Sequence, residues 1–173
     1  MNAAKKLLMI DDDVNLVNVF RLVCAAQGYD FHAAYSAAEG LEKIRAVKPD
    51  LIILDVIMED FVAGFRVVSE LRNAAPDSPF AAFARVPIVM LTSVTAKTHL
   101  SFSDRIGTAL LPVDDFIEKP VKPGEILGRI AAILARSSTP PADTVHGATS
   151  GPPSGSASVE PGAMGSSKVN SAH

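Results

Sequence analysis

Short apolar runs alternate with longer stretches of helical periodicity along most of the chain. The apolar runs occupy residues 7–10, 51–54, 88–91 and 116–117, and a fifth, weaker strand signal lies at 30–34. Apolar residues at helical spacing follow in 16–23, 41–47, 65–71 and 126–134. This repeated strand–helix alternation predicts an α/β fold, a doubly wound five-stranded parallel sheet with helices on both faces. The apolar runs show no alternation with polar residues, which supports this prediction, because strands covered by helices on both faces of the sheet carry apolar side chains on both faces.

Residues that start and stop helices fall at the expected places. Gly28 is a stop signal for the first helix, and Pro49 forbids continuation of the second. Ser36 and Glu39 form the pattern of a capping box, in which serine accepts from one free amide and glutamate reaches back to another. Pro123 suits the first turn of the last helix. These signals bound the same helices that the periodicity predicts.

The composition changes near Ser137. Residues 137–173 are dominated by Ser, Pro, Gly and Ala, with too few large apolar residues to offset the entropy of ordering. We therefore expect a folded domain at 1–136 and a disordered tail at 137–173. A passive extension and a docking segment both fit this tail, and the absence of anchor residues favours the extension.

Charge and cysteine content narrow the function classes. A net charge of −3 gives no electrostatic case for nucleic-acid binding. Cys24 is the single cysteine, so the sequence excludes an intramolecular disulfide and a multi-cysteine metal site, and a packed role in the first helix is expected. The first apolar run is cut by aspartates, unlike a signal peptide, and no segment has the length of a membrane span. We expect a cytoplasmic protein without membrane contact.

Polar residues stand at the carboxyl end of each of the four apolar runs. They are Asp11, Asp12, Asp55, Thr92 and Lys119. In open parallel sheets, ligands bind beyond these strand ends, so the residues are expected to meet at one point. Carboxylates suit Mg²⁺, and an aspartate can carry a phosphoryl group whose oxygens a lysine and a hydroxyl stabilise. Each residue alone has an ordinary explanation as a cap, turn residue or solvated charge, but the joint pattern indicates a phosphoryl-acceptor site.

Four motifs carry a resemblance to a known family. They are Ile10-Asp11-Asp12, Leu54-Asp55-Val56-Ile57-Met58, Met90-Leu91-Thr92-Ser93 and Phe116-Ile117-Glu118-Lys119-Pro120. In this order and spacing, residues 5–136 resemble the receiver domain of two-component response regulators. The resemblance implies a flavodoxin-like sheet of strand order 2-1-3-4-5.

The resemblance also implies a role for each site residue. Asp55 would accept phosphate from a phosphohistidine on a sensor histidine kinase or a histidine phosphotransfer protein, and the domain would catalyse its own phosphorylation and dephosphorylation. The Mg²⁺ ligands would be Asp11 (mainly through water), Asp12, Asp55 and the backbone carbonyl of Ile57. Thr92 and Lys119 would bind the phosphoryl group, Phe116 would be the aromatic switch, and the bond before Pro120 would be cis.

Several segments depart from the family pattern. The loop after Met58 is one residue longer and lacks the usual proline, and its Glu59 and Asp60 are either solvated acids or added charge near the metal site. Residues 75–87 form a long connection that is either a flap on the domain edge or a partner surface. The stretch between Thr92 and Lys119 is also long, which predicts a displaced, shortened or flexible fourth helix.

These observations favour a stand-alone phosphorelay receiver that signals by contact with an unidentified protein. Pairing of two copies through the fourth helix and fifth strand remains open. Two alternatives remain: a phosphatase with an aspartyl nucleophile, which usually has a second acid where this chain has Ile57, and a pseudo-receiver that only binds partners. The apolar residues Ile57 and Val94 cannot orient water, so the phosphorylated state is expected to be long-lived.

Overall fold

The sheet has five parallel strands, as the sequence predicts. The computed structural model describes residues 3–60, 62–73, 75–93 and 112–137. The strands are β1 (Lys6–Ile10), β2 (Asp30–Ala34), β3 (Leu51–Asp55), β4 (Ile88–Thr92) and β5 (Asp115–Glu118). They pair in the order β2-β1-β3-β4-β5, which confirms the expected flavodoxin-like arrangement.

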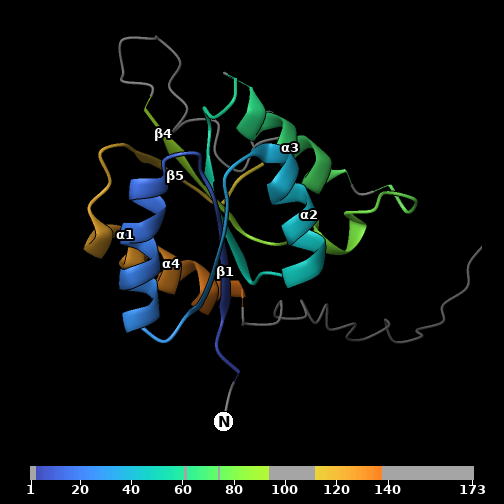
Figure 1. Cartoon of the computed structure of the whole chain (residues 1–173). Coiled ribbons are helices and arrows are strands. Elements are labelled where there is room, and N and C mark those ends of the chain that lie inside the picture. The colour runs from blue at the N-terminus through green and yellow to red at the C-terminus, as the bar shows by residue number, and fades with distance from the viewer. Residues whose placement is uncertain (1–2, 61, 74, 94–111, 138–173) are drawn as a thin grey trace, which may run out of the picture. The chain divides into compact units, whose positions relative to one another are not determined.

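Helices cover both faces of the sheet (Figure 1). On one side lie α2 (Ala37–Val47), α3 (Ala63–Arg72) and the short 3-10 helix η1 (Ala81–Phe83); on the other lie α1 (Val14–Ala26) and α4 (Pro123–Ser137). Successive strand residues therefore enter different cores. In β1, Leu8 and Ile10 pack on the α2 and α3 side, whereas Leu7 and Met9 pack on the α1 and α4 side.

The helix ends follow the sequence signals. Gly28 has a φ of +79° just after α1, a conformation that glycine adopts without strain. At the start of α2, Ser36 Oγ accepts from Glu39 N (3.2 Å), as expected of a capping box. The Glu39 carboxylate accepts from Tyr35 N (2.7 Å), the residue before the cap. The glutamate thus reaches back to a backbone amide as predicted, and the structure identifies that amide as the one of Tyr35.

The long connection after α3 packs on the edge of the domain. Phe80 is only 6% exposed and lies in the core beneath α2 and α3, with the Arg45 guanidinium over its ring. Arg72, at the end of α3, donates to the carbonyl oxygens of Pro112, Ala84 and Val86 at 2.8, 2.9 and 3.0 Å. These contacts favour a packed flap over a partner surface for residues 75–87.

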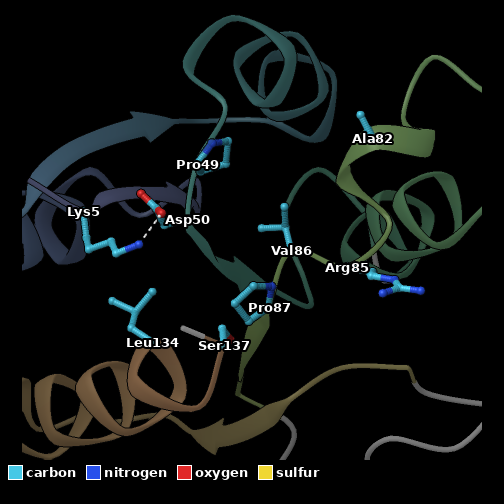
Figure 2. A pocket seen from close by; sticks show the side chains of 9 residues that line it. All are labelled: Lys5, Pro49, Asp50, Ala82, Arg85, Val86, Pro87, Leu134 and Ser137. Carbon is cyan, nitrogen blue, oxygen red and sulfur yellow. Dashed lines mark hydrogen bonds and ion pairs between the residues drawn. The ribbon is translucent and has the colours of Figure 1, made fainter. Parts of the chain in front are cut away.

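The amino ends of the strands enclose a hollow of about 300 Å³ (Figure 2). Its wall includes the ion pair between Lys5 Nζ and Asp50 Oδ1 (2.9 Å). This hollow lies at the end of the sheet opposite the acids singled out by the sequence. Among the described residues, no helix has the length and apolar character needed to cross a membrane.

Two predicted regions fall largely outside the described residues. The helix expected between Thr92 and Lys119 falls mostly in 94–111. The tail predicted from 137 onward is described only at Ser137, which is the last residue of α4. The predictions for both regions therefore stay predictions.

Candidate functional site

The strand registers bring the predicted site residues to one edge of the sheet. Ile10 pairs with Leu54, so Asp11 and Asp55 follow directly opposite positions on neighbouring strands. On the next pair, Asp55 is opposite Leu91, which precedes Thr92. Thr92 is in turn opposite Glu118, which precedes Lys119. Asp55 and Thr92 thus lie within their ladders, and Asp11 and Lys119 lie one position beyond theirs.

Alternation along the strands explains which side chains meet. Asp11 has the same parity as Leu7 and Met9, and Asp55 the same parity as Leu51 and Ile53, all of which face α1 and α4. Lys119 likewise continues the parity of Ile117. Because successive side chains point to opposite faces, these three polar residues emerge on the same side of the sheet.

Lys119 joins the two buried acids directly. Its Nζ donates to Asp11 Oδ2 at 2.9 Å and to Asp55 Oδ2 at 2.8 Å. The remaining oxygens accept backbone amides, Asp11 Oδ1 from Asp13 N (2.9 Å) and Asp55 Oδ1 from Ile57 N (3.2 Å). Asp11 is fully buried and Asp55 is 4% exposed. The two carboxylates are therefore held in fixed orientations beside one ammonium.

Burial and pairing act against each other at this site. Burial raises the pKa of Asp11 and outweighs the opposing hydrogen bonds from Lys119 and Asp13. Burial would lower the pKa of Lys119, but the hydrogen bonds to Asp55 and Asp11 outweigh it and raise the pKa. Lys119 therefore stays protonated, and its stabilising effect is lost only as the pH rises through its raised pKa.

Three carboxylates form a group that suits a metal ion. Oxygens of Asp11, Asp12 and Asp55 lie within 4.8 Å of one another, and Asp12 is exposed to solvent. Three carboxylates and one ammonium leave two negative charges, which a divalent cation would neutralise. The all-oxygen donors are those that hard cations such as Mg²⁺ prefer. The residues present thus fit such an ion.

The other predicted residues lie on β4 and β5. Thr92 is 1% exposed, and its carbonyl oxygen accepts from Lys119 N at 2.6 Å. Phe116 is half-buried and packs against the core beneath α2 and α3. The Lys119–Pro120 peptide bond is cis. The switching roles of Thr92 and Phe116 stay predictions.

Comparison with known proteins decides the family. The model of the response regulator receiver domain matches residues 7–131. The chain belongs to this family. Receiver domains bind Mg²⁺ at an acidic pocket and interact with histidine kinases or phosphotransfer proteins. The sequence-based recognition is thereby confirmed.

The individual matches agree with this assignment. The DNA-binding response regulator MtrA of Mycobacterium tuberculosis is 31% identical over 139 residues, covering 80% of this chain and 54% of MtrA. The regulator PhoP of Bacillus subtilis, named for alkaline phosphatase synthesis, is 33% identical over 133 residues, covering 77% of this chain and 50% of PhoP. The chain spans about half the length of these relatives.

Solved structures show the same fold. A putative response regulator from Chloroflexus aurantiacus aligns with a TM-score of 0.62 and 29% identity, covering 77% of this chain and 99% of that one. A CheY-like receiver domain from Methanospirillum hungatei aligns with a TM-score of 0.60 and 25% identity, covering 77% and 95%.

Two features of this receiver domain were missed in the sequence. A Cβ on Gly64 would lie 2.3 Å from the carbonyl oxygen of Asp55, so α3 approaches the acceptor strand too closely for any side chain. Glu59 is exposed but bound, because its Oε1 accepts from Ala37 N (3.1 Å) at the start of α2. Asp60 likewise pairs with Arg66 (2.7 Å). Both side chains keep substantial exposure to solvent, which is compatible with the interpretation as solvated loop acids, and each also has a partner that the sequence did not indicate.

Proposed function

We propose that this receiver accepts a phosphoryl group on Asp55 in a two-component phosphorelay and signals by protein contact. The double bridge from Lys119 to Asp11 and Asp55 carries the proposal, because it sets an ammonium beside the acceptor oxygen. Asp12 completes the acidic group in which an Mg²⁺ ion would sit. The donor would be a sensor histidine kinase or a histidine phosphotransfer protein.

The transfer needs positioning and charge neutralisation more than acid–base groups. A carboxylate oxygen of Asp55 attacks phosphorus, and the P–O bond forms as the P–N bond to histidine breaks. The electron pair of the P–N bond stays on that ring nitrogen, and the histidine leaves as neutral imidazole with the proton already carried by its other ring nitrogen. Lys119 neutralises one phosphoryl oxygen, and the Thr92 hydroxyl donates to another. When bound, Mg²⁺ supplies the further positive charge that lets a dianionic group approach the acids.

The phosphorylated state would change the surface near β4 and β5. When the Thr92 side chain moves toward the phosphoryl group, it leaves space into which the Phe116 ring rotates. Phenylalanine has no hydroxyl that could form a hydrogen bond, so burial of the ring alone drives this rotation. Ile57 offers no hydrogen bond to an attacking water, so Asp55 would keep its phosphoryl group. Loss of label from isolated protein within seconds would contradict this expectation.

The output and the partners are the finer part of the proposal. MtrA is named as DNA-binding and PhoP as a transcriptional regulator, and each is matched over about half its length. These names leave the expected absence of nucleic-acid binding unconfirmed. For residues 1–136 we propose contact with another protein, because their sequence shows no cluster of basic residues.

Phosphoryl uptake can be tested by mass. The full chain is incubated with Mg²⁺ and a small acyl phosphate, and the intact mass is measured. The wild type should gain one phosphoryl group, Asp55→Ala should gain none, and Asp77→Ala, which alters an exposed acid of the flap, should behave as wild type. Equal gain by Asp55→Ala would refute the acceptor assignment.

The alternatives predict different results. A phosphatase would release phosphate from an ester over many turnovers, and a pseudo-receiver would take up no phosphoryl group.

A further inference from the structure

Glu59 ties the loop after the acceptor strand to a different element. This loop, 56–62, joins β3 to α3 and contains Ile57, the predicted carbonyl ligand of the cation. The Glu59 carboxylate accepts from Ala37 N, the first residue of α2, at 3.1 Å from Oε1 and 3.4 Å from Oε2. Amides in the first turn of a helix have no partner within the helix. Glu59 supplies one from 22 residues away.

The rest of the loop is held to its own strand and helix. Gly64 N donates to Val56 O (3.2 Å), and Met58 N donates to Asp60 O (3.3 Å). Asp60 accepts from Val62 N (2.9 Å) and pairs with Arg66 of α3. All of these contacts lie within the continuous segment formed by β3, the loop and α3, so none of them joins the loop to another element. Among the described residues, Glu59 alone accepts a hydrogen bond that joins the loop to α2.

We infer that Glu59 is a positioning residue for the cation site of this receiver. Ile57 lies between two fixed points, since its amide donates to Asp55 Oδ1 (3.2 Å) and the chain is held again at Glu59. Fixing both sides restricts the peptide that carries the Ile57 carbonyl. This inference rests on the proposed function, because it concerns how the same site holds Mg²⁺.

The contact also explains the unusual sequence of the loop. Residues 56–62 contain no proline that would stiffen the backbone. The hydrogen bond from Ala37 N to the Glu59 carboxylate fixes the loop to α2 and thereby restricts a backbone that no proline stiffens. Arg66 Nη2 lies 4.0 Å from Glu59 Oε1, and because both side chains are exposed this pair contributes little beside the bond to Ala37 N.

Two substitutions separate position from charge. Glu59→Ala removes both the hydrogen bond and the charge, whereas Glu59→Gln keeps an oxygen that can accept from Ala37 N. Glu42→Ala removes an exposed charge from α2 and leaves the loop contact intact. Rates of phosphoryl uptake from a small acyl phosphate are measured against Mg²⁺ concentration for each full-length protein, with thermal unfolding in the absence of Mg²⁺ as a check on folding.

Glu59→Ala should raise the half-saturating Mg²⁺ concentration by roughly five- to tenfold, as loss of one hydrogen bond of ordinary strength predicts. Its maximal rate at saturating Mg²⁺ should stay within about twofold of wild type, since Asp55 and Lys119 are untouched. Glu59→Gln and Glu42→Ala should both resemble wild type.

Each other result has a distinct meaning. If Glu59→Gln behaves as Glu59→Ala, the effect comes from charge and the positioning role is wrong. An unchanged half-saturation for Glu59→Ala overturns it equally. If wild type itself takes up no phosphoryl group, the proposed function fails instead.

Discussion

Gly64→Ala tests how tightly the acceptor strand and α3 are packed. The added Cβ would lie 2.3 Å from Asp55 O, 2.8 Å from Val56 Cα and 3.0 Å from Val56 O. All three are backbone atoms, so no side chain can rotate away. An ordinary contact begins at 3.4 Å, so the helix and the strand end must separate by about 1 Å.

This separation has two measurable effects. Overpacking of this kind lowers the free energy of unfolding by about 1–3 kcal/mol, to be read from urea denaturation followed by circular dichroism. A displacement of about 1 Å at the acceptor aspartate lowers the rate of phosphoryl uptake by about 10²-fold. Both effects arise from the same contact, so they should appear together.

Gly128→Ala is the matched control. Gly128 lies inside α4, and a Cβ there would meet nothing within 4 Å. Alanine should therefore raise the free energy of unfolding by about 0.5–1 kcal/mol, because glycine is the poorer helix former. The phosphorylation rate should not change. If Gly64→Ala unfolds at the wild-type urea concentration and takes up phosphate at the wild-type rate, the packing argument is refuted.

Three further predictions concern ionic contacts. Arg72→Lys should lower the free energy of unfolding by about 1–3 kcal/mol in urea denaturation. The three carbonyl oxygens are reached from two separate nitrogens of the planar guanidinium, Nε and Nη1, and the single nitrogen of an ammonium cannot occupy both positions. An unchanged midpoint would count against this prediction. Burial acts to raise the pKa of Asp50, but the hydrogen bonds from Lys6 N and Lys5 outweigh burial, so the net effect is a lowered pKa. The ionised Asp50 carboxylate therefore stabilises the fold at neutral pH, and this stabilisation is lost as the pH falls below about 4. Asp50→Asn should show less of this acid loss in pH-dependent denaturation, and an identical profile would contradict the assignment. Lys119→Met removes the ammonium that neutralises the buried carboxylates of Asp11 and Asp55, so these two carboxylates should repel each other. Mg²⁺ would relieve this repulsion and should therefore raise the melting temperature of the variant, measured by calorimetry, more than that of wild type. An equal rise in both proteins would show that the carboxylates do not repel.

The parts of the fold predicted from sequence are those with dense apolar patterns. β3 is buried along its whole length, and its apolar run identified it directly. β2 gave a weaker signal because it lies at the sheet edge and pairs only with β1, which leaves Asp30 exposed. Predicted strands ended one residue early at Asp55 and Thr92, because the ladder continues onto the polar site residues.

The site was predictable because its residues follow the strands directly. Strand ends are visible as the end of an apolar run, and parallel pairing then brings them together. The contacts of Glu59 and Arg72 were not predictable, because their partners lie 22 and up to 40 residues away and show no periodic signal. Such long-range polar contacts depend on the packed arrangement of loops, which no local pattern records.

Because β3 pairs with β1 on one edge and with β4 on the other, the position of Asp55 along the sheet does not depend on the loop that follows it. β1 and β4 together set the height of Asp55, whatever the length of the chain between Met58 and Gly64. A segment there can gain a residue, exchange a proline for an acid or be grafted from another receiver without shifting the reactive oxygen along its strand. Strand pairing thus fixes where the acceptor stands in the sheet, and the loop acts only on the groups around it, through the Ile57 amide on Asp55 Oδ1 and the Glu59 contact with Ala37 N.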